Sequence, residues 1–147
     1  MTAFKRWMSA LVIVCMTGIG MPLPASAAIV GTDQVAALTT AQVSNLTPTQ
    51  LAALKTAQVA AMETADLAKL TTVQVTALTT AHMTALTTDQ LVALTTAQVS
   101  SLTTAQLIAL NTGQIAAMQT DDLNALSTAQ LSSMGSLQIA SFTTDQV

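Results

Sequence analysis

The sequence predicts an all-α solenoid, in which very short helices, one for each eight-residue repeat, stack into a superhelix. From Gly31 the chain divides into fourteen consecutive octads that end at Phe142. The second place of the octad is threonine in all but two units, the fourth is mostly glutamine, and the fifth is always aliphatic or methionine. Fixed self-similarity at a short period is typical of solenoids. Because a unit of eight residues is too short to fold alone, its stability must come from stacking on its neighbours.

Each octad carries a signal for the start of a helix. Thr-x-x-Gln before an apolar residue is a capping-box pattern, and Thr47-Pro48-Thr49-Gln50 is its clearest copy, with proline at the first helical position. In three octads a residue that caps poorly holds the first place, namely Lys55, Glu63 or Gln119. The threonine at the second place is an alternative cap in those three units.

The spacing inside the octad predicts which places are buried. Places five and eight are three residues apart and lie on one helical face, so Val43 with Leu46, or Leu107 with Leu110, should enter a shared core. Places one, three and six should face solvent or partners. The candidate partner-facing residues are those that differ there from the common unit: Lys55, Glu63, Asp89, Val92, Ile108 and Asn111.

Two other architectures are open to such a repeat. In one continuous helix the apolar positions would drift by about 80° per octad and would not form a stripe. A β-solenoid with two octads per coil is the stronger alternative, since threonine and valine recur regularly. Abundant alanine, leucine and glutamine without strict alternation favour the short helices.

The first part of the chain predicts export. Lys5 and Arg6 precede an apolar run, and Ala25-Ser26-Ala27 supplies small residues for cleavage after Ala27. We therefore expect a signal peptide at 1–27, a lead at 28–30 and the octad array at 31–147. The predicted location is secreted, periplasmic or at the cell surface, with no membrane insertion after cleavage.

A second period of 56 residues lies over the octads. Asp33, Asp89 and Asp145 have this spacing, and so do Asp66 and Asp122. These coincidences predict a duplicated block of seven octads, which comprises 31–86 and 87–142 with a partial unit at 143–147.

Charge narrows the classes of partner. Cleavage after Ala27 leaves two lysines against seven acidic residues and removes the single cysteine, Cys15. So few cations cannot neutralise phosphates, which excludes nucleic acid as an expected partner.

Few residues offer chemistry. His82 and Met83 are residue types that ligate haem iron, but they occupy the glutamine and aliphatic places of their octad, so repeat drift explains them better. Asp121 and Asp122 lack the further oxygen ligands that calcium needs, and we expect them near a helix N-terminus. We therefore predict no enzymatic activity, and no catalytic, cofactor-binding or metal-binding residues.

The units from Leu38 to Val147, of the type LTTAQVAAL, resemble octapeptide arrays in exported bacterial proteins, some of them labelled adhesins or haem-utilisation proteins. The resemblance implies a structural or interaction module at the bacterial surface, with haem uptake as an alternative. A second alternative comes from the repeated threonines, which could bind ice or a surface if they lined one flat face. Self-association through the open repeat end is also expected, because solenoids normally carry polar caps.

Overall fold

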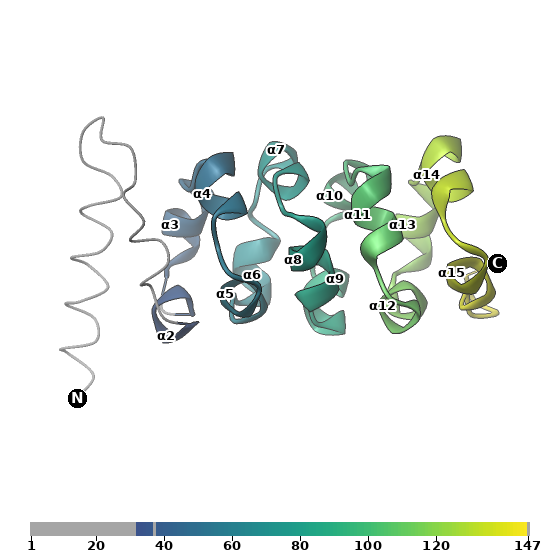
Figure 1. Ribbon diagram of the computed structural model, residues 1–147, viewed down its shortest axis with the longest axis horizontal. Helices are drawn as coiled ribbons and strands as arrows, with labels where there is room; N and C mark the ends of the chain where they lie inside the picture. The colour runs from purple at the N-terminus through teal and green to yellow at the C-terminus, as the bar shows by residue number, and fades with distance from the viewer. Residues whose placement is uncertain (1–31, 37, 147) are drawn as a thin grey trace.

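The computed structural model describes residues 32–36 and 38–146, and this part of the chain is a solenoid of short helices (Figure 1). One helix falls in each octad: α2 (Thr32–Val35), α3 (Thr40–Ser44), α4 (Pro48–Ala52), α5 (Thr56–Ala60), α6 (Thr64–Leu67), α7 (Thr72–Thr76), α8 (Thr80–Ala85), α9 (Thr88–Val92), α10 (Thr96–Ser100), α11 (Thr104–Ala109), α12 (Thr112–Ala117), α13 (Thr120–Asn124), α14 (Thr128–Ser133) and α15 (Ser136–Ala140). The described residues contain no strand, so the short-helix prediction is confirmed and the β-solenoid is wrong. The predicted signal peptide at 1–27 and the lead at 28–30 lie outside the described residues.

The capping box sets where each helix begins. Before α11, Thr103 is in the extended region at φ −72° and ψ 157°. Its hydroxyl accepts from the Gln106 amide at 3.2 Å, and its own amide donates to Gln106 Oε1 at 2.9 Å. Because the Thr103 amide bonds to the Gln106 side chain, it does not bond to a carbonyl group of the preceding helix, and that helix does not continue past it.

The register of the caps is constant, which corrects one sequence-based alternative. Lys55, Glu63 and Gln119 at the first place are the N-caps of α5, α6 and α13, although their side chains make no capping bond. The threonines that follow them are therefore not caps. In α5 the glutamine half of the box persists, with the Lys55 amide donating to Gln58 Oε1 at 2.6 Å. Stacking between coils fixes the register even where the local capping signal is weak.

The core follows the predicted pattern. Side chains at places five and eight form one continuous cluster along the solenoid, from Val35 to Met134. Val43 and Leu107 have no exposed surface, and Leu110 is 3% exposed. In the last coil the cover is thinner, and Ile139 at place five is 43% exposed.

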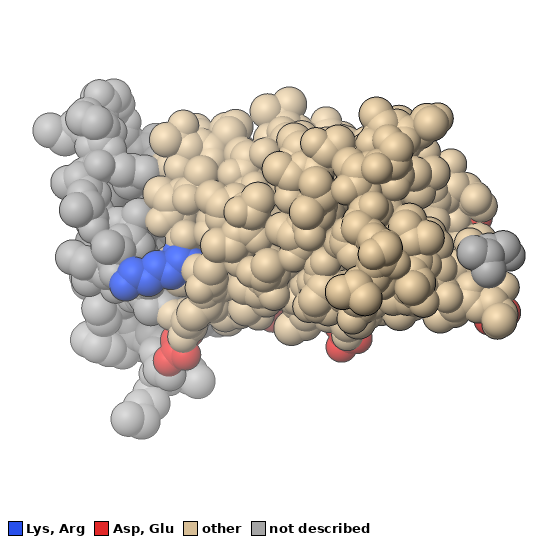
Figure 2. All heavy atoms as spheres, turned by 45° about the vertical axis from the view of Figure 1, so that its right-hand side comes forward, with Lys and Arg blue, Asp and Glu red and all other residues tan. Residues whose placement is uncertain are grey.

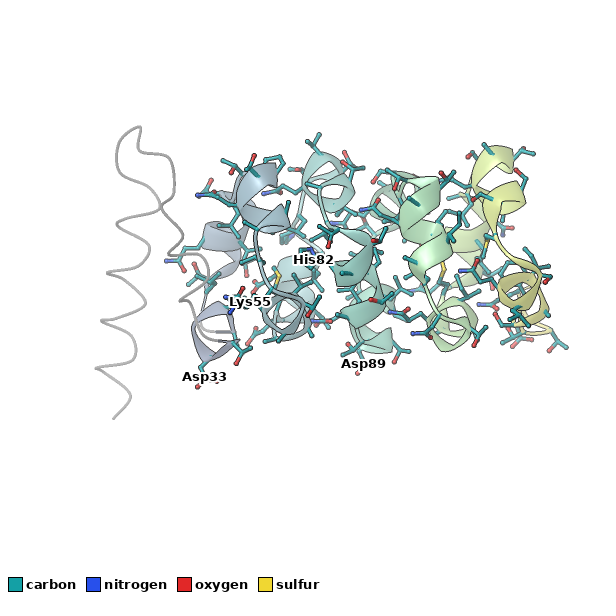
Figure 3. All side chains as sticks on the ribbon, viewed as in Figure 1. Asp33, Lys55, His82 and Asp89 are labelled. Atoms are coloured by element: carbon teal, nitrogen blue, oxygen red, sulfur yellow. The ribbon has the colours of Figure 1, made fainter. Side chains whose placement is uncertain are left out.

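One turn of the solenoid takes about three and a half octads. Each helix packs against the helix three units away, as in the series α5, α8, α11 and α14. Hydrogen bonds between coils join residues that are 28 and 31 positions apart in sequence. Two turns therefore take 56 residues, which equals the spacing of the repeated aspartates. Residues 56 apart lie in line along the axis, as Asp33 and Asp89 do on one edge in Figure 3.

Candidate functional site

The glutamine at place four is buried in most octads and bonds in two directions. The capping box predicted the bond to its own octad, whereas sequence reasoning did not anticipate the burial or the bond to the preceding coil. The glutamine Oε1 atom accepts from the first-place amide of its own octad, while its Nε2 atom donates to the preceding coil. For Gln106, Nε2 lies 2.7 Å from the Leu78 carbonyl oxygen and 2.9 Å from that of Val75. The side chain is 2% exposed. One side-chain amide thus caps a helix N-terminus and also forms hydrogen bonds between two coils.

This contact recurs as a ladder along the solenoid, and we call each such side chain with its bonds a rung. The bond to the place-eight carbonyl of the preceding coil measures 2.6–2.8 Å in every case. The rungs with this bond are Gln74, Gln90, Gln98, Gln106, Gln114, Gln130, Gln138 and Gln146. Buried amides with both ends paired are stabilising because the unpaired alternative is costly.

His82 replaces one glutamine and makes the same two bonds. Its Nδ1 atom lies 3.2 Å from the Thr79 amide, and its Nε2 atom lies 2.8 Å from the Leu54 carbonyl oxygen. The carbonyl can only accept, so these partners assign the proton to Nε2 and the lone pair to Nδ1. His82 is 2% exposed and Met83 is fully buried. Because both ring nitrogens are engaged, iron ligation by His82 would require breaking this rung.

Asp66 replaces another glutamine and closes no rung. The side chain is 2% exposed, and its Oδ2 atom is buried with no hydrogen-bond partner among the described residues. By the register of the ladder, the carbonyl groups opposite it are those of Val35 and Leu38. An ionised carboxylate has only acceptors, so it cannot pair with carbonyl oxygens.

Asp122 occupies the same column two turns later and has partial compensation. The Thr96 hydroxyl donates to its carboxyl group. Gln119 at the first place sends its Nε2 atom to the Val92 carbonyl oxygen of the preceding coil, at 3.2 Å. Burial raises the pKa of the Asp122 carboxyl above its ordinary value; the Thr96 bond lowers it in part, and the neighbouring Asp121 charge raises it. Asp121 and Asp122 both lie in the first turn of α13, as expected.

The surface consists of places one to three and place six. The predicted partner-facing residues are all exposed, and they are Lys55, Glu63, Asp89, Val92, Ile108 and Asn111. Asn111 also has a structural role, because its Oδ1 atom accepts from the Gln114 amide at 2.9 Å as the cap of α12. Figure 2 shows how few charged side chains interrupt this uncharged surface.

Several large apolar side chains break the polar pattern of the surface. Val73 and Leu137 at place three are 63% and 77% exposed, and Ile108 at place six is 54% exposed. Gln138 donates to the Ile108 carbonyl oxygen at 3.3 Å, so the coil that carries Leu137 lies directly on the coil that carries Ile108. Sequence reasoning named Ile108 and Val92 but missed Val73 and Leu137, although both replace the usual alanine or aspartate.

The described part of the chain has no group of three or more His, Cys, Asp or Glu side chains that could hold a metal ion. None of its helices has the length and apolar character that a membrane span requires.

Comparison with known proteins identifies the repeat. The fold and the octads define a helical tandem-repeat protein. The chain matches the ALTTAQ repeat family over residues 59–96, 88–120 and 115–147, which together cover more than half of its length. It belongs to that family. Neither the curated proteins nor the solved structures contain a match.

Proposed function

We propose that this chain is an exported, non-enzymatic module that binds protein or surface ligands along the side of its solenoid. The observation that carries the proposal is the division of the octad into two sets of places. Places four, five and eight are mostly buried in the ladder and core, while places one to three and six are mostly exposed and hold most of the variation. A solenoid of this kind presents a long lateral surface whose residues change without loss of the fold.

The exposed apolar side chains support a binding role. Val73, Ile108 and Leu137 occupy places that the fold does not need to fill with apolar groups. Apolar groups that come together on an otherwise polar face are typical of interaction sites, and the coils that carry Ile108 and Leu137 are adjacent. The signal-like segment that ends at Ala27 supports a location outside the cytoplasm.

Export and binding need separate experiments. Amino-terminal sequencing of the protein from an expressing bacterial culture should give Ala28 as the first residue, and uncleaved protein retained in the cytoplasm would contradict export. For binding, the purified protein would be tested on immobilised fibrinogen, collagen, mucin and polystyrene. We expect the triple variant Val73→Thr, Ile108→Thr and Leu137→Thr to lose binding.

The matched control is Thr72→Ser, Thr104→Ser and Thr128→Ser, which changes exposed second-place residues and removes only one methyl group from each. Equal binding by wild type and the apolar triple variant would overturn the proposed binding surface.

Ice binding is a second candidate function that one observation favours. The second-place threonines that begin helices are exposed, except for the half-buried Thr40, whereas first-place hydroxyls such as that of Thr103 are used in capping. A regular set of outward threonines could order water. Thermal hysteresis of the purified protein at millimolar concentration tests this, and its absence would exclude ice binding.

A further inference from the structure

Two buried carboxyl groups interrupt the ladder at places where glutamine otherwise donates a hydrogen bond. Asp66 and Asp122 are 2% and 3% exposed, and they are the acidic members of the place-four set in the described chain. A carboxylate retains the acceptor function of glutamine and loses its donor. A protonated carboxyl group has one O–H donor and therefore regains the lost function.

We propose that Asp66 and Asp122 are proton-dependent rungs, which donate to a carbonyl group of the preceding coil when protonated and are open when ionised. The proton comes from water and binds one carboxyl oxygen, and no other bond forms or breaks covalently. In the Asp122 rung, the place-eight acceptor set by the register is the Leu94 carbonyl. In the Asp66 rung it is the Leu38 carbonyl, and the unpartnered Oδ2 atom is the oxygen that gains the proton.

The surroundings of Asp122 favour the neutral form. Its own helix adds Asp121, and α10, which packs against it, contributes the Thr96 hydroxyl and no charged side chain. Thr120 donates to the Asp145 carbonyl at 3.0 Å, so the turn that contains Asp145 also lies against α13. The pKa of Asp122 is raised by burial first. No cation faces this carboxyl group from the described elements packed on it.

The helices packed against the element that carries Asp66 also bring no cation. Helices α3 and α9 pack against α6, and the charged side chain that they bring is Asp89. Glu63 and Lys69 lie in the same octad as Asp66 and are both exposed. The ionised form of Asp66 therefore places a charge at a buried Oδ2 atom that has no hydrogen-bond partner among the described residues.

The sign of the pH effect follows from the raised pKa of Asp122. A carboxyl group whose folded pKa exceeds the unfolded value binds more protons in the folded state. Its stabilising contribution is complete below the unfolded pKa, and it is lost as pH rises through the folded pKa. Acidification from neutral pH should thus increase the stability of the folded solenoid, whereas most proteins lose stability in acid.

The test is the melting temperature of the purified protein from pH 4.5 to pH 7.5, followed by circular dichroism. We expect the wild type to melt several degrees higher at pH 4.5. The double variant Asp66→Gln and Asp122→Gln should melt higher than wild type at pH 7.5 and should lose the pH difference. Asp89→Asn is the control. Because Asp89 is exposed, this variant should keep the wild-type difference in melting temperature between pH 4.5 and pH 7.5.

A direct readout avoids dependence on unfolding. The ¹³Cγ shift of Asp122 should titrate above the ordinary range of an aspartate, because burial raises its pKa. Titration of Asp122 in the ordinary range of an aspartate would overturn the proposal, as would a wild-type melting temperature that is flat or falls in acid. A rise of the melting temperature with calcium chloride or sodium chloride at pH 7.5, lost in the double variant, would assign the rungs to a bound cation and would also overturn it.

Discussion

His82 and Asp66 stand at the same place of different octads, and one keeps the ladder intact while the other breaks it. The imidazole ring has an acceptor nitrogen and a donor nitrogen, so it reproduces both bonds of glutamine, to Thr79 and to Leu54. The carboxylate of Asp66 has acceptors alone, and it is shorter than glutamine by one methylene group. The comparison shows that a closed rung at place four needs a side chain that both accepts and donates, rather than glutamine as such.

The largest expected effect comes from deleting an intact rung. Gln106→Leu keeps the buried volume but leaves the Thr103 amide and the Leu78 carbonyl without their side-chain partner. Unpaired buried groups cost about 1–3 kcal/mol each, so we expect a loss of about 3 kcal/mol in the free energy of unfolding. Urea denaturation measures it. If Gln106→Leu were as stable as wild type, the ladder would not contribute to stability.

The next effect tests whether the imidazole is a true substitute. His82→Ala removes both bonds and leaves a cavity, with an expected loss of about 2–3 kcal/mol. His82→Gln restores the common residue and should lie within about 1 kcal/mol of wild type. Thermal melts of the two variants compare them directly. A loss in His82→Gln equal to that in His82→Ala would show that histidine has a separate role.

The reverse change repairs the broken rung. Asp66→Gln supplies the missing donor and removes a buried carboxylate, and we expect a gain of about 1–2 kcal/mol at neutral pH. The measurement is again urea denaturation, with Asp89→Gln as the exposed control. A loss of stability in Asp66→Gln would mean that the surrounding coil has adapted to the shorter side chain.

The smallest effect separates the two threonines of the octad. Thr103→Ala removes a cap and should cost about 1 kcal/mol. Thr104→Ala, at the exposed second place, should change stability by less than about 0.5 kcal/mol. Equal losses in the two variants would contradict the capping register.

Much of the architecture could be predicted because its causes are local. The Thr-x-x-Gln pattern and the spacing between Val43 and Leu46 act within one octad, so they indicate the cap and the buried face directly. The burial of Gln106 could not be predicted in this way, since polar residues are expected at the surface. The partners of Gln106 in the preceding coil lie 28 and 31 residues away in sequence. The octad pattern does not predict how many octads form one turn of the solenoid.

The candidate site likewise contains some features that the octad predicts and others that depend on contacts between coils. The exposure of Asp89, Val92 and Ile108 follows from their places in the octad. The difference between Asp66 and Asp122 does not, because it depends on contacts between coils. Thr96 of the preceding coil supplies a hydroxyl to Asp122, and Gln119 of the same octad bonds back to that coil. The 56-residue spacing was visible as a regularity, and the superhelical turn gives it a physical reason.

The sequence by itself determined the octad, the start of the helices whose first place is a good cap, and the apolar places that form the core. These depend on contacts within a few residues, and the repeat states them fourteen times. Only the tertiary structure decided the number of octads in a turn, and with it the carbonyl groups that each place-four side chain meets. That choice depends on packing between coils, so the same local position becomes a closed rung at Gln106 and His82 and an open one at Asp66.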